Sequence, residues 1–187
     1  MTTPAWKDWY HCYVGTYGQR LPGDPRGWRE RNRHEEIPKP MNWSSQFTKF
    51  AKARHDHSRR IMNFEPYEFA QADRPIVGKL LLSFLQSKEV KALSLALGAT
   101  HFHALLQLPN HKPKQLLGMV KRHITFEFAP IIDPATNQRR QIWEANGRAK
   151  PLRDRAHGIS VFKYILNHAN QGAWVWSYKN QLPDPLP

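Results

Sequence analysis

Hydrophobic and polar residues alternate in three segments of this chain, which predicts strands. These segments are "DWYHCYVGTYG" at 8–18, "VKALSLALGATHFHALLQLP" at 90–109 and "AWVWSY" at 173–178. Successive side chains of a strand point to opposite faces, so alternation indicates a sheet with two different surroundings. The segment at 90–109 divides near Gly98, which predicts an antiparallel hairpin. Three leucines of its first strand are expected to pack on one face: Leu93, Leu95 and Leu97.

Other segments repeat hydrophobic residues every three or four positions, which predicts helices. The expected helices lie at 47–62, 74–90, 112–128 and about 161–171. In the last helix, Ser160 occupies the N-cap position and Gly172 follows the expected end. Its core face is expected to consist of Phe162, Ile165, Leu166 and Ala169. Its opposite flank is expected to carry Tyr164, His168 and Gln171.

The remaining segments connect these elements. From about residue 20 to 47 the chain is rich in Pro, Gly and charge and has no core-facing stripe, which indicates a basic insertion. "NGRAKPLRDR" at 146–155 is a basic segment between two elements, and "LPDPLP" at 182–187 is a short C-terminal tail. Because 40% of the 187 residues are hydrophobic, residues 1–187 are expected to form one domain.

The chain carries a large excess of positive charge. It has 28 Lys and Arg against 15 Asp and Glu, which gives a net charge of +13. A field of this sign attracts polyanions, so the composition favours a nucleic-acid partner. A membrane partner is not expected, because the charge is scattered and no apolar run is long enough to span a bilayer. The N-terminus lacks the order of a signal peptide, which predicts a cytoplasmic protein with nucleoid-associated activity.

Histidine and tyrosine supply the candidate chemistry. His101 and His103 lie one residue apart in "THFHALLQLP", so they share one face of a strand. Tyr164 and His168 lie four residues apart, so they are neighbours on a helix flank. If these groups converge, three neutral imidazoles can hold a divalent cation and leave positions for phosphate oxygens. A tyrosine oxygen beside that cation can attack phosphorus.

These residues give the chain a resemblance to a known family. "HFH" at 101–103 looks like the His-hydrophobic-His signature of the single-tyrosine HUH transposases of insertion sequences. "YILNHANQGAWV" at 164–175 looks like the tyrosine helix of that family. "TYGQRLPGDPRGW" at 16–28 and "LLGMVKRHITFEF" at 116–128 are similar to further segments of it. The sequence resembles the REP-associated tyrosine transposase branch most closely, over residues 10–176.

The resemblance implies an α+β fold of the ferredoxin-like, HUH endonuclease type, in which helices flank an antiparallel sheet, and it implies a homodimer. It also implies that His101, His103 and His168 bind Mg²⁺ or Mn²⁺, and that no nucleotide cofactor is needed. Tyr164 would attack single-stranded DNA at hairpin-containing ends, become linked to the 5′ phosphate and release a 3′ hydroxyl. A second hydroxyl could reverse the attack and join new ends, in DNA transposition or in the processing of palindromic repeats.

Two departures from the family pattern concern the signature strand and the third metal ligand. "GATHFH" stands where the family often has Pro-Asn-His, and His168 stands where Asn or Gln is common. A further nitrogen donor shifts the preference of the site towards softer ions such as Mn²⁺ or Zn²⁺.

Six basic residues are candidates for binding DNA phosphates: Lys121, Arg122, Arg148, Lys150, Arg153 and Arg155. Two alternatives stay open: a domesticated, non-catalytic binder of hairpin DNA or RNA, and a nuclease that activates water.

Overall fold

The computed structural model describes residues 6–29, 36–37, 45–128, 132–133 and 138–179. The chain divides into two compact units, one of which is Tyr17–Tyr67. The other combines Met1–Thr16 with Glu68–Pro187, and it contains the candidate site. The expected C-terminal tail lies outside the described residues. Within the described ranges, no helix has the length and apolar character that a membrane span requires.

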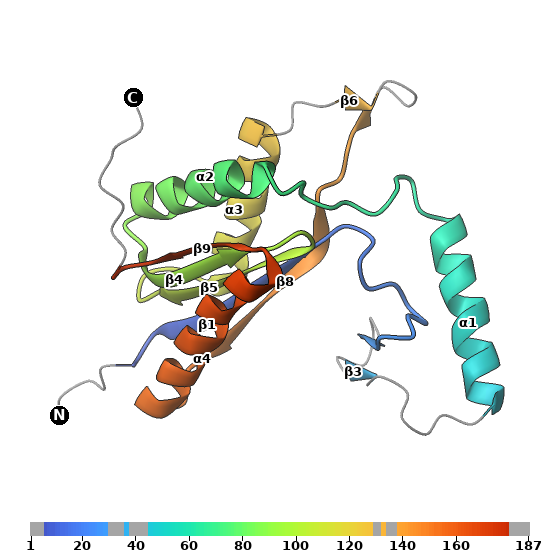
Figure 1. Ribbon diagram of the computed structural model, residues 1–187, viewed down its shortest axis with the longest axis horizontal. Helices are drawn as coiled ribbons and strands as arrows, with labels where there is room; N and C mark the ends of the chain where they lie inside the picture. Colours follow the sequence, from blue (N-terminus) through green and yellow to red (C-terminus); the bar gives the residue numbers. More distant parts are fainter. Residues whose placement is uncertain (1–5, 30–35, 38–44, 129–131, 134–137, 180–187) are drawn as a thin grey trace. The chain divides into compact units, whose positions relative to one another are not determined.

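The larger unit is built on a five-stranded antiparallel sheet with the strand order β8–β1–β5–β4–β9 (Figure 1). The strands are β1 (Trp9–Thr16), β4 (Lys91–Leu97), β5 (His101–Gln107), β8 (Trp143–Pro151) and β9 (Trp174–Ser177). Two further short strands, β6 (Ile132–Asp133) and β7 (Gln138–Arg139), pair with each other. The expected α+β class and antiparallel sheet are therefore confirmed.

Three helices connect the strands of this sheet. Helix α2 (Asp73–Ser87) lies between β1 and β4 in the sequence, and α3 (Pro113–Phe128) lies between β5 and β8. Helix α4 (Arg155–Asn167) lies between β8 and β9. The strands joined through α2 are separated in the sheet by β5, and those joined through α3 are separated by β1. Each connection therefore crosses over one strand, which is how a βαβ unit is built.

The helices cover the two faces of the sheet unequally (Figure 1). Helices α2 and α3 pack against each other on one face. On this face Gly78 of α2 lies against Trp174 of β9, and a Cβ atom added at Gly78 would come within 2.1 Å of the Trp174 ring. On the other face, Val161 and Ile165 of α4 pack on Leu105 of β5. Helix α4 contacts β4, β5 and β9. The half of that face formed by β1 and β8 carries polar and aromatic side chains.

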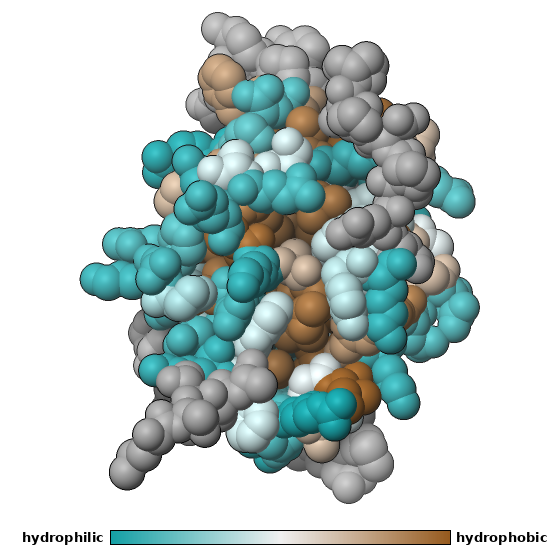
Figure 2. Space-filling model, turned by 90° about the vertical axis from the view of Figure 1, so that its left-hand side faces the viewer, coloured by the Kyte–Doolittle hydropathy of each residue, from teal (hydrophilic) through white to brown (hydrophobic). Residues whose placement is uncertain are grey.

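The hydrophobic core lies mainly between the sheet and the pair α2 and α3. Its fully buried side chains in the larger unit include Phe69, Leu81, Leu85, Leu95, Leu97, Phe102, Leu106, Leu116, Leu117 and Ile124. Cys12 of β1 belongs to this core, and its burial raises the pKa of the thiol to about 12. Hydrophobic surface is visible between hydrophilic side chains on the side of the molecule shown in Figure 2.

The expected hairpin is confirmed, since β4 and β5 pair in antiparallel register on either side of Gly98. The expectation for its three leucines was partly wrong. Leu95 and Leu97 are completely buried in the core, whereas Leu93 packs with the cluster beneath α4. A β-bulge shifts the register at Leu93 and turns that side chain to the other face. Alternation in the sequence does not reveal such a bulge.

Helix α4 begins six residues earlier than its sequence pattern indicates. The N-cap is Asp154 rather than Ser160, because the Asp154 carboxylate accepts a hydrogen bond of 2.7 Å from the backbone N–H of His157. Ser160 lies inside the helix, where its hydroxyl donates to a backbone carbonyl one turn earlier. At the other end the helix tightens into a 3₁₀ turn, η1 (His168–Gln171), and Gly172 ends it at φ 72°. The expected stop at Gly172 is confirmed.

Strand β8 was not predicted, because most of it lies in the basic segment at 146–155. It pairs with β1 over most of its length and forms one edge of the sheet. Its side chains are mostly exposed or half-buried, so the sequence contains no hydrophobic alternation that would mark a strand. The basic residues of this segment therefore lie along one edge of the sheet.

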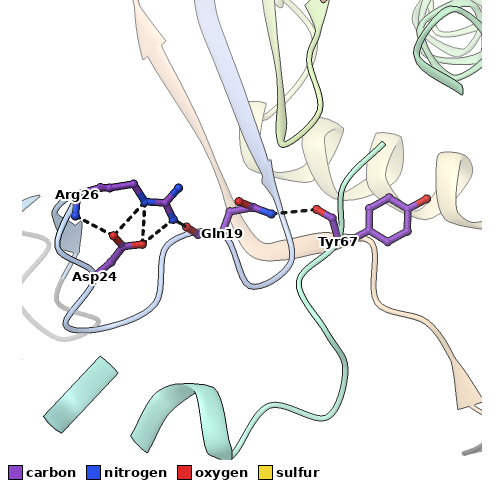
Figure 3. A network of polar contacts seen from close by, with 4 residues as sticks. All are labelled: Gln19, Asp24, Arg26 and Tyr67. Carbon is purple, nitrogen blue, oxygen red and sulfur yellow. Dashed lines mark hydrogen bonds and ion pairs between the residues drawn. The ribbon is translucent and has the colours of Figure 1, made fainter. Parts of the chain in front are cut away.

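The smaller unit contains β2 (Trp28–Arg29), β3 (Glu36–Ile37) and α1 (Ser45–Arg60), together with part of the expected basic insertion. Its polar network centres on Asp24, which is 2% exposed (Figure 3). Burial alone would raise the pKa of this carboxyl, but hydrogen bonds from Arg26 outweigh burial and lower it. Arg26 also donates to the Gln19 carbonyl, and the Gln19 amide donates to the carbonyl of Tyr67.

The position of the α4 N-cap gives a stability test. Replacing Asp154 by Ala removes the acceptor for the His157 N–H, so Asp154→Ala should lower the free energy of unfolding by about 1 kcal/mol. Ser160→Ala is the matched control and should change it much less, because Ser160 caps nothing. Urea denaturation followed by circular dichroism measures both values. A larger loss for Ser160→Ala than for Asp154→Ala would contradict the assigned helix start.

Candidate metal centre and nucleophile

Strand β5 brings two histidines to the sheet face on which α4 packs. In the antiparallel ladder, His103 stands opposite Tyr13 of β1, and His101 stands opposite Gly15. Partners in an antiparallel pair point to the same face. The two imidazole ring centroids are 4.9 Å apart, with the rings nearly perpendicular. The strand face shared by these two histidines is the one that the sequence predicts.

The third histidine comes from the end of α4. His168 begins the 3₁₀ turn η1, and its side chain is only 5% exposed. The sequence placed His168 on an open flank and Ala169 in the core, and the structure reverses both positions. Ala169 is exposed, whereas Ile165 is completely buried as expected. His168 is buried because its ring packs against the rings of His101 and His103 of β5, and the helical pattern of α4 does not show this contact.

The three imidazoles form a group that is positioned to bind a metal ion. One nitrogen atom from each of His101, His103 and His168 lies within 4.8 Å of the others. Nitrogens bound to a common ion at about 2.1 Å are separated by about 3–4 Å, so small side-chain rotations suffice to close the site. Among the described residues, no other such cluster of His, Cys, Asp or Glu is present. An all-nitrogen set suits Mn²⁺ or Zn²⁺ better than Mg²⁺, which prefers oxygen.

Hydrogen bonds orient each imidazole of the cluster. The Nδ1–H of His168 donates to the backbone carbonyl of Tyr164 at 2.9 Å, so its Nε2 carries the lone pair. Nδ1 of His101 lies 3.1 Å from the hydroxyl of Thr100. Nδ1 of His103 lies 2.9 Å from Nε2 of His11. Hydrogen bonding at the nitrogen away from the ion is the usual way in which proteins orient histidine ligands.

Burial and neighbouring charges keep the imidazole of His103 uncharged. Burial is the largest cause that lowers the pKa of His103, to about 2, and the neighbouring His101, His168 and His11 lower it further. The pKa of His11 falls to about 4, first through burial and then through the positive charge of Lys150. A neutral imidazole retains the lone pair that a metal ion requires. His103 is therefore held in the form that can act as a metal ligand.

Tyr164 lies at the open side of the cluster, one helical turn before His168. Its side chain is 50% exposed, and its hydroxyl oxygen lies 3.5 Å from Nε2 of His103. The phenol ring meets the His168 ring edge-on at a centroid distance of 4.7 Å, and the His103 ring at 5.2 Å. The hydroxyl is therefore next to a candidate ligand nitrogen and open to an incoming molecule. It does not pack inside the hydrophobic interior.

Strand β1 adds two neighbours to the site that were not assigned to it from the sequence. His11 contacts His103, and the Tyr13 ring lies 5.0 Å from the His103 ring. The guanidinium of Arg148 lies over Tyr13 at 5.7 Å. The alternation of residues 9, 11 and 13 indicated one shared face. Only the pairing of β1 with β5 shows that this face is the histidine face.

The six basic residues expected to bind DNA lie in three places. Arg148 and Lys150 of β8 stand opposite Tyr13 and His11, so they share the face of the metal centre. Arg153 and Arg155 are exposed on either side of the α4 N-cap. Lys121 and Arg122 belong to α3, which packs on the other face, and both line a shallow groove next to β8. Lys121 donates to the carbonyls of Glu144 and Ala145, which gives it a structural role.

The chain was compared with protein-family models, curated proteins and solved structures, and no match was found.

Metal binding can be tested directly. We expect the full chain to bind Mn²⁺ with one-to-one stoichiometry in isothermal titration calorimetry at pH 7.5. Removing one of three nitrogen donors should weaken binding, so His168→Ala should raise the dissociation constant by more than about tenfold. His111→Ala is the control, because His111 is outside the cluster and its Nε2 lies near the Lys88 carbonyl. Equal affinities for the two variants would contradict the site.

The lowered pKa values predict instability in acid. Unfolded histidines take up a proton near pH 6.5, whereas His11 and His103 in the folded chain do so only near 4 and 2. Between these values the unfolded state binds more protons, so the stability present above pH 6.5 is lost as the pH falls. In EDTA, the free energy of unfolding should decrease by about 1–2 kcal/mol per pH unit between pH 6.5 and 4.5. Urea titrations at several pH values measure this slope.

A variant that lacks both side chains provides the control for the acid test. His11→Gln combined with His103→Gln should show a shallower pH dependence than the wild type, whatever its absolute stability. Stability that is constant or increases as the pH falls through this window would show that the two imidazoles are not held neutral.

Proposed function

We propose that this protein is a metal-dependent endonuclease and transposase of the HUH type, which cleaves and rejoins single-stranded DNA through a 5′-phosphotyrosine intermediate. The observation that carries the proposal is the position of the Tyr164 hydroxyl. It lies 3.5 Å from Nε2 of His103, beside three clustered imidazoles, on a half-exposed side chain. A nucleophilic oxygen next to a cation site is the arrangement that metal-assisted transesterification of a phosphodiester requires.

The strand order supports the finer fold assignment. Without β9 the order is β8–β1–β5–β4, and numbering these strands along the chain gives 4–1–3–2. Two β-α-β connections that interleave in this way are the pattern of ferredoxin-like folds. Helix α4 and strand β9 follow that core in the sequence, and α4 carries Tyr164. This topology supports the proposed HUH type in addition to the motifs.

The proposed reaction exchanges one phosphate ester for another. The Tyr164 oxygen attacks the phosphorus and forms a new P–O bond, while the bond from phosphorus to the 3′ oxygen breaks. The phenol loses its proton to solvent, which reaches the half-exposed side chain, and the leaving 3′ oxygen gains one. The protein then holds the 5′ phosphate, and attack by another 3′ hydroxyl restores a phosphodiester and free Tyr164.

His101, His103 and His168 would hold the metal ion, which we assign as Mn²⁺ or Mg²⁺. When bound, the ion would neutralise charge that develops on the phosphate oxygens. Hydrogen bonds orient the three rings, and His103 and His168 are also buried, so little reorganisation is needed when substrate arrives. The nitrogen donors favour Mn²⁺ of the two ions.

The surface around the site supports a polyanionic substrate. Arg148 and Lys150 are on the same sheet face as the histidines, and the chain has a net charge of +13. Cations in this position would bind backbone phosphates without reading bases. The preference for hairpin-containing ends and the homodimer are further parts of the proposal, and they derive from the family resemblance.

The nucleophile can be tested with two tyrosines of similar exposure. Tyr164 is 50% exposed and Tyr178 is 45% exposed. Wild type and Tyr178→Phe should form a covalent complex with hairpin-bearing single-stranded DNA in the presence of Mn²⁺, whereas Tyr164→Phe should not. The DNA should be labelled at its 3′ end, because the proposed linkage retains the fragment downstream of the break. Denaturing electrophoresis then shows label that migrates with the protein.

The other outcomes of this experiment identify the alternatives. If Tyr164→Phe still cuts the DNA, the protein is a nuclease that uses water. If the wild type binds DNA and never forms the covalent complex with any divalent ion tried, the protein is a non-catalytic binder. Either result would overturn the proposed strand transfer.

A further inference from the structure

His103 contacts polar groups through both of its ring nitrogens. Nε2 lies 3.5 Å from the Tyr164 hydroxyl, and His103 is one of the three clustered histidines. Nδ1 lies 2.9 Å from Nε2 of His11, which comes from the neighbouring strand β1. The rings of His11 and His103 are stacked, with centroids 5.1 Å apart and planes inclined at 30°. His11 is therefore held against His103 both by a hydrogen bond and by ring packing.

The proton between these two rings decides whether His103 can be a ligand. A neutral imidazole carries a proton on one nitrogen and a lone pair on the other. If His103 carries the proton on Nδ1, it donates to His11, and the lone pair on Nε2 points to the cluster. If His11 donates instead, the proton of His103 is on Nε2, and this nitrogen cannot bind an ion. The hydrogen bond at His11 therefore selects between two forms.

The hydrogen-bond partners at Nδ1 of the other two imidazoles differ from that of His103. His168 donates to the Tyr164 carbonyl, which can only accept, so its form is fixed by the backbone. His101 contacts the hydroxyl of Thr100, which can donate or accept. The Nδ1 of His103, in contrast, has the imidazole of His11 as its partner.

We propose that His11 is a positioning residue: its Nε2 accepts the Nδ1 proton of His103 and so directs the His103 Nε2 lone pair to the metal ion. Nothing in the sequence motif marks this role, because His11 lies 92 positions before His103. The inference rests on the metal centre of the proposed function and not on strand transfer by Tyr164. Partners of this kind typically alter metal affinity by about 10- to 100-fold.

Two substitutions of His11 distinguish the effect of its hydrogen-bond acceptor from the effect of its imidazole ring. His11→Leu has no acceptor, whereas His11→Gln can place its amide oxygen where Nε2 lies in the wild type. In the full chain, His11→Leu should raise the Mn²⁺ dissociation constant by about 10- to 100-fold, measured from the signal of free Mn²⁺ in electron paramagnetic resonance. His11→Gln should bind Mn²⁺ close to the wild-type affinity, and so should His111→Leu, which alters a histidine outside the cluster.

Nuclear magnetic resonance gives a readout that needs neither metal nor DNA. Long-range ¹H–¹⁵N correlation spectra of the metal-free protein, labelled with ¹⁵N in histidine, report which ring nitrogen carries the proton. His103 should carry it on Nδ1 in the wild type and in His11→Gln. In His11→Leu the population protonated on Nε2 should increase.

Three results would overturn the role of His11: wild-type Mn²⁺ affinity in His11→Leu, an Nε2 proton on His103 in the wild type, or a folded His11→Gln that binds as weakly as His11→Leu. If His11→Leu does not fold, the wild-type and His11→Gln spectra still decide the question. A protein that shows the expected metal and proton data, yet forms no covalent DNA complex, would refute strand transfer and leave the role of His11 intact.

Discussion

Positively charged imidazoles repel one another, so three of them can share a site only while they are neutral. Burial meets this condition at His103, which is 5% exposed and whose pKa falls to about 2. Burial alone would leave costly unsatisfied nitrogens, and each ring therefore has a hydrogen-bond partner at Nδ1. Where Nδ1 is the donor, as in His168, the lone pair on Nε2 is available to an ion. The position of Tyr164 has chemical meaning only because this ligand set exists.

The two faces of the sheet have different surroundings, and this difference positions the histidines of the site. The face beneath α2 and α3 holds most of the hydrophobic core, which anchors β5 through buried residues such as Phe102 and Leu106. The other face is covered by α4 over β4, β5 and β9, and it displays His11, Tyr13 and Arg148 from β1 and β8. Because β5 is the central strand, His101 and His103 lie where the covered and polar halves meet. Tyr164 of α4 and His168, which follows the end of that helix, lie against these two histidines.

The sequence predicted the elements with strong local signals and missed those defined by distant contacts. Alternation revealed the β4–β5 hairpin and the shared face of His101 and His103. It did not reveal β8, an edge strand whose basic residues lack a hydrophobic pattern, or the bulge that turns Leu93 to the α4 side. Helical spacing placed Tyr164 and His168 together, but it did not predict the burial of His168, which depends on contacts with His101 and His103 of a distant strand. His11 was not predicted to belong to the site, because the local sequence does not show which strands pair with each other.

A crystal structure of the Mn²⁺-loaded protein, with data collected at the manganese absorption edge, is the most direct test of the central claim. The account predicts one anomalous peak bonded to a nitrogen of each of His101, His103 and His168, with the Tyr164 hydroxyl facing the open side of the ion. A peak bound elsewhere, or an ion held by these histidines with Tyr164 turned away from it, would contradict the account.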